Sequence, residues 1–171
     1  RSIGPEDQDW LGTSLPKAEY GINLDLSYKE FSLNVFMSGV AGKNAHDDWQ
    51  GFATRVANGM NFGTESLNAW TDSNKGSDIP ALSLVNANDE GRSSDFTISN
   101  HSYFKVRNIS LAYSLPRATL QKIKVQQLRI YLMADNMILI ADRSGTNRYW
   151  GPDPEHGHGD PLPVAFTLGL N

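Results

Sequence analysis

Residues 103–116, which read YFKVRNISLAYSLP, have the pattern of one long β-strand that ends at a proline. In the second half of the stretch, apolar and small residues alternate with a period of two. Ile109, Leu111 and Tyr113 would share one face of a strand, and the small residues between them the other. Lys105 and Arg107 add two positive charges that a dry core would not accept. The stretch therefore predicts a sheet with an apolar face, a polar face and a basic end.

Four other stretches show the same alternation. Residues 18–28 and 31–40 are separated only by Lys29 and Glu30, which predicts a tight hairpin. Residues 125–135 alternate again, residues 136–141 extend them, and residues 164–171 close the chain in the same way. Residues 117–124 follow Pro116 and favour a short helix of about one turn. The sequence thus predicts an all-β, antiparallel fold of about five strands.

The connections between these strands alternate in length. The links at Lys29 and around Thr119 are short, whereas residues 41–101 and 142–161 are long and rich in Gly, Asn and Asp. Short turns at one end and long extracellular loops at the other are typical of a transmembrane β-barrel. The alternative is a soluble β-sandwich with one wet face on each sheet, which explains the alternation but not the loop lengths.

Composition excludes several other classes of protein. The 171 residues are enough for one ordinary domain, and a net charge of −4 offers no basic surface for nucleic acid. The absence of cysteine excludes disulfides and thiolate catalysis. No apolar run reaches the roughly 20 residues of a transmembrane helix, and no catalytic or phosphate-binding motif occurs. We therefore expect no enzyme, no cofactor and no metal.

Several motifs follow one another in a characteristic order. They are P-x-x-x-Y-G from residue 16, Y-K-x-F-x-L from residue 28, the strand at 103–116, L-R-I-Y from residue 128, D-P-E from residue 153 and the closing strand 164–171. In this order they resemble the C-terminal end of SusC/RagA-type TonB-dependent outer-membrane receptors of Bacteroidetes. Two positions depart from that pattern. The basic pair is Lys105 then Arg107 rather than Arg then Lys. The family ends on an aromatic residue, whereas this sequence stops at Asn171, so we expect its last residues to be missing.

The resemblance implies that residues 1–171 are the C-terminal segment of a receptor barrel in the cell outer membrane. It implies import of glycans or peptides, driven through TonB, together with a SusD-like surface lipoprotein that caps the barrel. The expected partners are the remainder of the receptor chain (its plug and other barrel strands), this lipoprotein, TonB through the missing N-terminal part, and outer-membrane lipid, but no nucleic acid. The alternative function, which belongs to the soluble fold, is a carbohydrate-binding module.

Tryptophans in the long loops are the first candidates for ligand or partner binding. Trp49, Trp70 and Trp150 would stack on sugar rings or contact the lipoprotein, because aromatic side chains dominate interface energetics. The alternative is that these three side chains pack the loops on themselves.

A second candidate lies in the segment DPEHGHG. Asp153 and Glu155 are possible ligand or partner contacts, and His156 and His158 add a weak hint of a metal site. A polar loop that turns on Gly and Pro is the simpler interpretation, so we expect no metal there.

The barrel and the sandwich differ in the exposure of the apolar face. A barrel leaves this face exposed on the isolated chain and covers it with lipid, whereas a sandwich packs it against a second sheet. On the opposite face, Asn23, Asp25, Arg129 and Asp135 would line a transport path or pair across strands. The residues whose exposure decides between the two folds are Tyr20, Ile22, Leu24, Leu26, Phe166 and Leu168.

Overall fold

The computed structural model describes residues 4–55, 59, 61–85, 91–143, 148–157 and 159–171. The chain divides into two compact units. The strand unit consists of residues 18–41, 103–140 and 161–171, and the loop unit consists of residues 1–17, 42–102 and 141–160. Segments that are far apart in the sequence therefore fold together in each unit.

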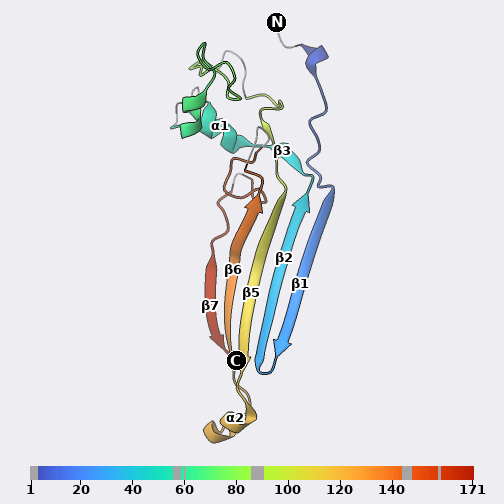
Figure 1. Cartoon of the computed structure of the whole chain (residues 1–171), viewed down its shortest axis with the longest axis vertical. Helices are drawn as coiled ribbons and strands as arrows, with labels where there is room; N and C mark the ends of the chain where they lie inside the picture. The colour runs from blue at the N-terminus through green and yellow to red at the C-terminus, as the bar shows by residue number, and fades with distance from the viewer. Residues whose placement is uncertain (1–3, 56–58, 60, 86–90, 144–147, 158) are drawn as a thin grey trace. The chain divides into compact units, whose positions relative to one another are not determined.

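The strand unit is one five-stranded sheet in the order β1-β2-β5-β6-β7 (Figure 1). Within this sheet the strands lie side by side in their order along the chain, and the pairs β1–β2, β2–β5 and β6–β7 are antiparallel, so the sheet is an antiparallel meander. The predicted all-β fold is confirmed, and residues 136–141 extend the fourth strand of the sheet as expected. The strands are β1 (Ala18–Tyr28), β2 (Phe31–Ala41), β5 (Tyr103–Ser114), β6 (Arg129–Ala141) and β7 (Ala165–Leu170).

Both short connections have left-handed residues. Tyr28 lies opposite Phe31 across a two-residue turn, so the tight hairpin is confirmed. Lys29, the first residue of that turn, has φ 53°, as primed two-residue turns require. Between β5 and β6, α2 (Arg117–Ile123) is longer than the single turn expected, and it ends at Lys124 with φ 55°.

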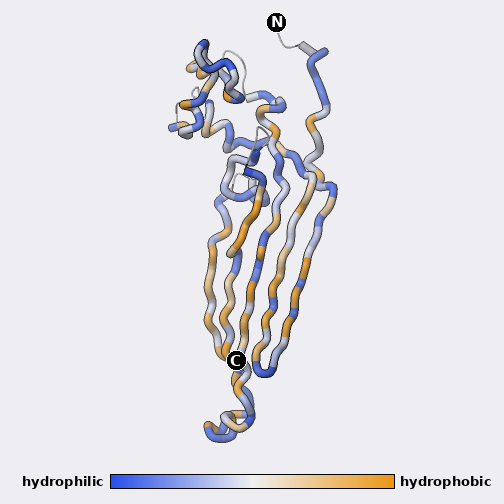
Figure 2. Tube along the Cα trace, in the orientation of Figure 1, coloured by the Kyte–Doolittle hydropathy of each residue, from blue (hydrophilic) through white to orange (hydrophobic). Residues whose placement is uncertain are grey.

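Cross-strand register arranges the apolar residues of β1, β2 and β5 in rows on one face. At the turn end the rings of Phe31 and Tyr113 lie 4.8 Å apart, and at the other end the rings of Tyr20 and Phe104 stack at 6.4 Å. Figure 2 shows the resulting alternation of apolar and polar residues along the strands. Three rows lie between the aromatic ends: Leu26, Leu33 and Leu111; Leu24, Val35 and Ile109; and Ile22, Met37 and Val106.

A β-bulge interrupts β5 at its basic end. Phe36 pairs with Asn108 and the next residue, Met37, pairs with Val106, so Arg107 is an extra residue in β5. Side chains alternate between the two faces of a strand, so Val106 and Ile109, three residues apart, would lie on opposite faces of a regular strand. The extra residue shifts this alternation by one position, and Val106 therefore lies on the apolar face with Ile109.

The bulge also explains how the sheet accommodates its basic residues. Lys105 is opposite Ser38 on the polar face and is only 4% exposed. Arg107 donates a hydrogen bond from Nε to the Oγ atom of Ser38 at 2.7 Å. The polar face thus receives both charges without a shift of the whole strand.

Cross-strand hydrogen bonds connect the other polar side chains of this face. The pairing that we considered for Asn23, Asp25, Arg129 and Asp135 is present in the structure. The bonds run from Asn34 Nδ2 to Asn23 Oδ1 (3.0 Å) and Asp25 Oδ1 (2.7 Å), from Asn108 Nδ2 to Asp135 Oδ1 (2.7 Å), and from Arg129 Nη2 to Ser32 Oγ (3.0 Å).

The apolar face is exposed. Among the side chains chosen to decide between the two folds, the exposed fraction ranges from 40% for Tyr20 to 73% for Leu168. A sandwich would have packed these side chains against a second sheet. Their exposure is that expected of a barrel segment, and it contradicts the sandwich.

The loop unit is more regular than the sequence predicted. We expected residues 41–101 to be irregular, but the described part of this segment includes four short elements: β3 (Asn44–His46), α1 (Asp48–Thr54), η3 (Thr64–Asn68) and β4 (Ile98–Asn100). β3 and β4 pair as a two-stranded antiparallel ladder, and η1 (Pro5–Asp7) lies near the start of the chain. None of the described helices is long and apolar enough to cross a membrane.

Candidate functional site

Asp47 connects three segments of the loop unit. Its carboxylate caps α1 by accepting a hydrogen bond from the Trp49 backbone N–H at 3.1 Å. The same carboxylate accepts bonds from Ser99 Oγ at 3.0 Å and from the Trp150 backbone N–H at 2.7 Å. Asp47 is 2% exposed. A buried carboxylate with three donors fixes α1, β4 and the segment around Trp150 relative to one another.

Tyr149 is the largest fully buried side chain near this junction. Its hydroxyl donates to the Asp153 carbonyl at 2.8 Å and lies 3.1 Å from the Gly157 carbonyl, and its ring packs edge-on against His101. Burial, and then the carboxylates of Asp47 and Asp153, raise the pKa of Tyr149 to about 12. The tyrosine is therefore a neutral hydrogen-bond donor at ordinary pH.

The three predicted tryptophans occupy different surroundings. The indole Nε1 of Trp49 donates to the Gly157 carbonyl at 2.9 Å, and the ring meets Phe52 edge-on at 6.0 Å. Trp70 is 39% exposed. Trp150 lines a cavity of the loop unit, and Trp49 and Trp70 do not line that cavity. The structure therefore does not join the three rings into one platform, and their role in binding stays a prediction.

Asp153 and Glu155 lie in a tight loop with His156. Asp153 is buried and accepts hydrogen bonds from the Glu155 backbone N–H at 3.0 Å and from His156 Nδ1 at 3.3 Å. One ligand atom from each of the three residues lies within 4.8 Å of the others, so the set has the composition of a cation site. The hydrogen bonds of Asp153 account for the same arrangement as a loop structure. His158 lies outside the described residues.

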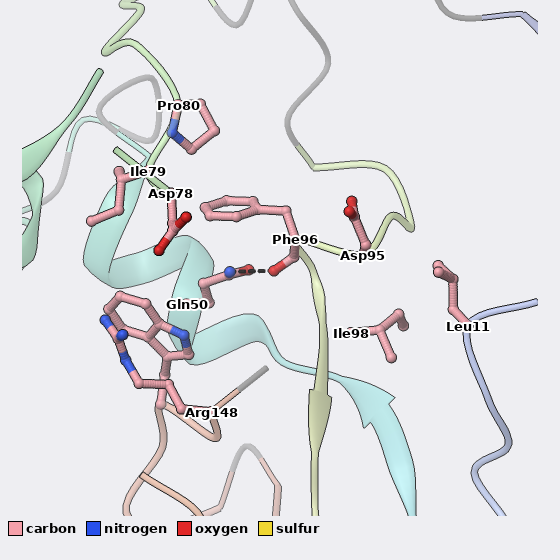
Figure 3. A pocket seen from close by; sticks show the side chains of 10 residues that line it. Leu11, Gln50, Asp78, Ile79, Pro80, Asp95, Phe96, Ile98 and Arg148 are labelled. Atoms are coloured by element: carbon pink, nitrogen blue, oxygen red, sulfur yellow. Dashed lines mark hydrogen bonds between the residues drawn. The ribbon is translucent and has the colours of Figure 1, made fainter. Parts of the chain in front are cut away.

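The loop unit contains a cavity of about 510 Å³ (Figure 3), a size typical of pockets that bind small ligands. Apolar side chains, including Phe96 and Ile79, make up half of its lining, and polar or charged side chains and Trp150 make up the rest. Gln50, on α1, donates a hydrogen bond from Nε2 to the Phe96 carbonyl and so fixes one wall. The cavity is thus built on the same junction that Asp47 organises.

Sequence reasoning did not find this junction or this cavity. The signal for the junction was present, because an Asp before a short helical segment is a typical N-cap. Residues 48–54 lack the apolar stripe of an amphipathic helix, so the sequence does not predict a helix for Asp47 to cap. The cavity gathers residues from Leu11 to Trp150, and no local pattern indicates that convergence.

Comparison with known proteins gives a consistent result. No family model matches the chain. It is 29% identical to TonB-dependent receptor P3 of Formosa agariphila over 99% of its own length and 17% of that protein. It is 26% identical to TonB-dependent receptor P26 of the same organism, over 99% of the chain and 18% of that protein. The chain therefore spans less than a fifth of the length of these relatives.

Solved structures of the RagAB peptide importer match as well. In the closed-closed state, the match has a TM-score of 0.73 and 25% identity, and covers 93% of this chain and 17% of the other. In the open-open state, the TM-score is 0.63 and the identity 28%, over 85% of this chain and 15% of the other. These relatives are named as receptors and importers rather than as enzymes, in agreement with our expectation.

These matches, the five-stranded meander and its exposed apolar face confirm the resemblance found in the sequence. The chain corresponds to the C-terminal barrel part of a SusC/RagA-type TonB-dependent receptor of the outer membrane.

Proposed function

We propose that the protein to which this chain belongs imports nutrients across the outer membrane, as oligomers of amino acids or sugars. The observation that carries the proposal is the match of the strands and loops together, over 93% of the chain, to a peptide importer. The sheet has rows of apolar side chains on one face and hydrogen-bonded polar side chains on the other, as the wall of a transport barrel requires. TonB supplies the energy through the plug.

The proposal includes a SusD-like surface lipoprotein as partner. The importer that this chain resembles is named RagAB, a pair in which RagA is the TonB-dependent receptor. Residues 41–101 and 142–161 are the proposed outer loops that such a lipoprotein would contact. Affinity purification of the tagged full receptor from native outer membranes should recover a lipoprotein in equal amounts. Recovery of the receptor alone would contradict the partnership.

Deletion of the full receptor gene tests import itself. Cells are grown on a mixture of peptides and oligosaccharides, and the medium is followed by mass spectrometry. We expect the mutant to leave one class of oligomer in the medium, and the wild-type gene to restore its uptake. Identical depletion by both strains would refute the proposed function. Dissipation of the proton-motive force should abolish the same uptake, because TonB depends on it.

The orientation of the loops is tested by cysteine labelling, since the chain has no cysteine of its own. Ser93→Cys places a thiol on an exposed loop position, and Gln121→Cys places one on exposed α2. A membrane-impermeant maleimide added to intact cells should label the Ser93→Cys receptor and not the Gln121→Cys receptor. The reverse result would place the short turns outside and overturn the loop assignment.

A further inference from the structure

The cavity of the loop unit has an acidic mouth. Asp78 and Asp95 line it and are both exposed, and neither makes a hydrogen bond or ion pair with another described residue. Figure 3 shows their side chains on opposite sides of the Phe96 ring. Two carboxylates beside an apolar cavity favour a cation at the mouth, since neither is neutralised within the described part of the loop unit.

Another part of the lining is aromatic and carries the only guanidinium among the residues that line the cavity. The Arg148 guanidinium carbon lies 4.1 Å from the centroid of the Trp150 ring. That face of the indole is therefore covered and does not stack on a sugar ring. The Trp150 Nε1 atom is buried and has no hydrogen-bond partner among the described residues.

The apolar part of the lining needs an apolar ligand group. Ile79 is 7% exposed, and Phe96 and Ile98 are half-buried. A neutral glycan offers hydroxyl groups to this wall and no charge to the two carboxylates. A peptide with a lysine or arginine beside apolar residues offers a cation and apolar side chains at once.

From this geometry we propose that the cavity binds peptide segments in which a cationic side chain adjoins apolar ones. Asp78 and Asp95 bind the cation, and Phe96 and Ile79 contact the apolar side chains. The inference rests on the proposed import function and deepens it, because it selects cationic peptides among the oligomers that such a receptor imports.

The test uses the full receptor in isolated outer membranes and two fluorescent peptides, Gly-Leu-Lys-Phe-Gly and Gly-Leu-Glu-Phe-Gly, both blocked at the C-terminus. The variant is Asp78→Asn with Asp95→Asn, which keeps side-chain size and removes both charges. The matched control is Asp72→Asn, an exposed acid of the same loop that does not line the cavity. Binding is measured by fluorescence anisotropy, with maltoheptaose as an uncharged competitor.

We expect the wild type to prefer the lysine peptide, and the double variant to bind that peptide about three- to tenfold more weakly, as exposed charge pairs allow. The glutamate peptide should bind the double variant no more weakly than the wild type, and Asp72→Asn should behave as the wild type. Equal binding of the lysine peptide to wild type and double variant would overturn the inference.

Displacement of the lysine peptide by maltoheptaose at similar concentration would also overturn it. Neither of these results touches the import proposal, which is decided by depletion of the growth medium in the gene deletion. A receptor that imports oligosaccharides alone would therefore refute the cavity assignment and leave the import function intact.

Discussion

The strand unit and the loop unit distribute apolar and polar side chains in opposite ways. All eleven residues of β1 are exposed, and every side chain of the three apolar rows except Val106 is exposed or half-buried. In the loop unit, polar side chains form most of the buried set. These are Asp47, Gln50, Thr54, Ser66, Thr97, Ser99, His101 and Asp153.

The difference indicates two sources of stability. The sheet is held by its backbone ladder and gains the usual benefit of apolar burial only when lipid covers the rows. The loop unit instead satisfies buried polar groups with one another and with the backbone, as in the three bonds that Asp47 accepts. A charge introduced into the sheet should therefore lower its stability only on the apolar face. In the loop unit, removal of a charge should lower stability at the buried junction around Asp47.

The largest expected effect comes from a charge in the middle apolar row. Ile109→Lys places an ammonium group near the centre of the lipid-facing surface, at a cost of about 2–4 kcal/mol. Ser110→Lys is the matched control, because Ser110 is the next residue of the same strand and faces the polar side. Heat-modifiable mobility on gels should show less assembled receptor for Ile109→Lys and normal amounts for Ser110→Lys. Equal assembly of the two variants would mean that the faces are misassigned.

The next effect falls on the loop unit. Asp47→Ala removes the α1 cap and leaves the Ser99 hydroxyl and the Trp150 N–H buried without an acceptor, at a cost of about 2–3 kcal/mol. Limited proteolysis of the full receptor should then cut the loops faster, while the barrel keeps its heat-modifiable mobility. Asp72→Ala, an exposed acid of the same unit, should leave the cleavage rate unchanged. Loss of the barrel in Asp47→Ala would show that the two units are not independent in stability.

The sequence predicted the strand unit better than the loop unit for a physical reason. Alternation with a period of two is a local signal, and it remains visible when lipid replaces a protein core. The bulge also left a trace, since Val106 and Ile109 are three residues apart where the alternation requires two. From the sequence, the break in alternation indicates only that one end of the strand is basic, whereas in the structure it marks a bulge that shifts the side chains to the other face.

The loop unit depends on contacts that leave no local trace. Trp150 is a candidate from the sequence because aromatic side chains dominate interface energetics, but its neighbours in the cavity have no such signal. Asp78, Asp95 and Arg148 come from three different segments and resemble ordinary loop residues. Only the fold brings them to one cavity. The sequence offers Asp153 as a possible ligand or partner contact; in the structure it is 3% exposed and bonded within its own loop, and the role in binding stays a prediction.

Tyr149 makes the stability of the loop unit depend on pH. Burial raises its pKa from 10.0 to about 12, so the folded loop keeps the proton more tightly than an unfolded one. Its contribution is complete below pH 10 and is lost as the pH rises from 10 to 12. Acrylamide quenching of tryptophan fluorescence should increase over this range in the wild type. At neutral pH the loop unit of Tyr149→Phe should be less stable than that of the wild type by about 1 kcal/mol. Its quenching should not change between pH 10 and 12. Parallel pH curves for both proteins would exclude Tyr149 as the source of the change.

The smallest expected effect is on the hairpin turn of the strand unit, which is stabilised mainly by backbone hydrogen bonds. Lys29 has φ 53°, a conformation that costs a residue with a Cβ atom roughly 1 kcal/mol and costs glycine little. Lys29→Gly should therefore stabilise the hairpin by about 0.5–1 kcal/mol, even though it removes the contact between the Lys29 ammonium and the Tyr28 ring. Glu30→Gly is the control, since Glu30 has a negative φ and gains nothing from glycine. Urea unfolding of the receptor from lipid vesicles should rank the variants as Lys29→Gly, wild type and Glu30→Gly. If both glycine variants destabilise the barrel equally, the turn contributes to stability through its side chains, and the positive φ of Lys29 is not a source of strain.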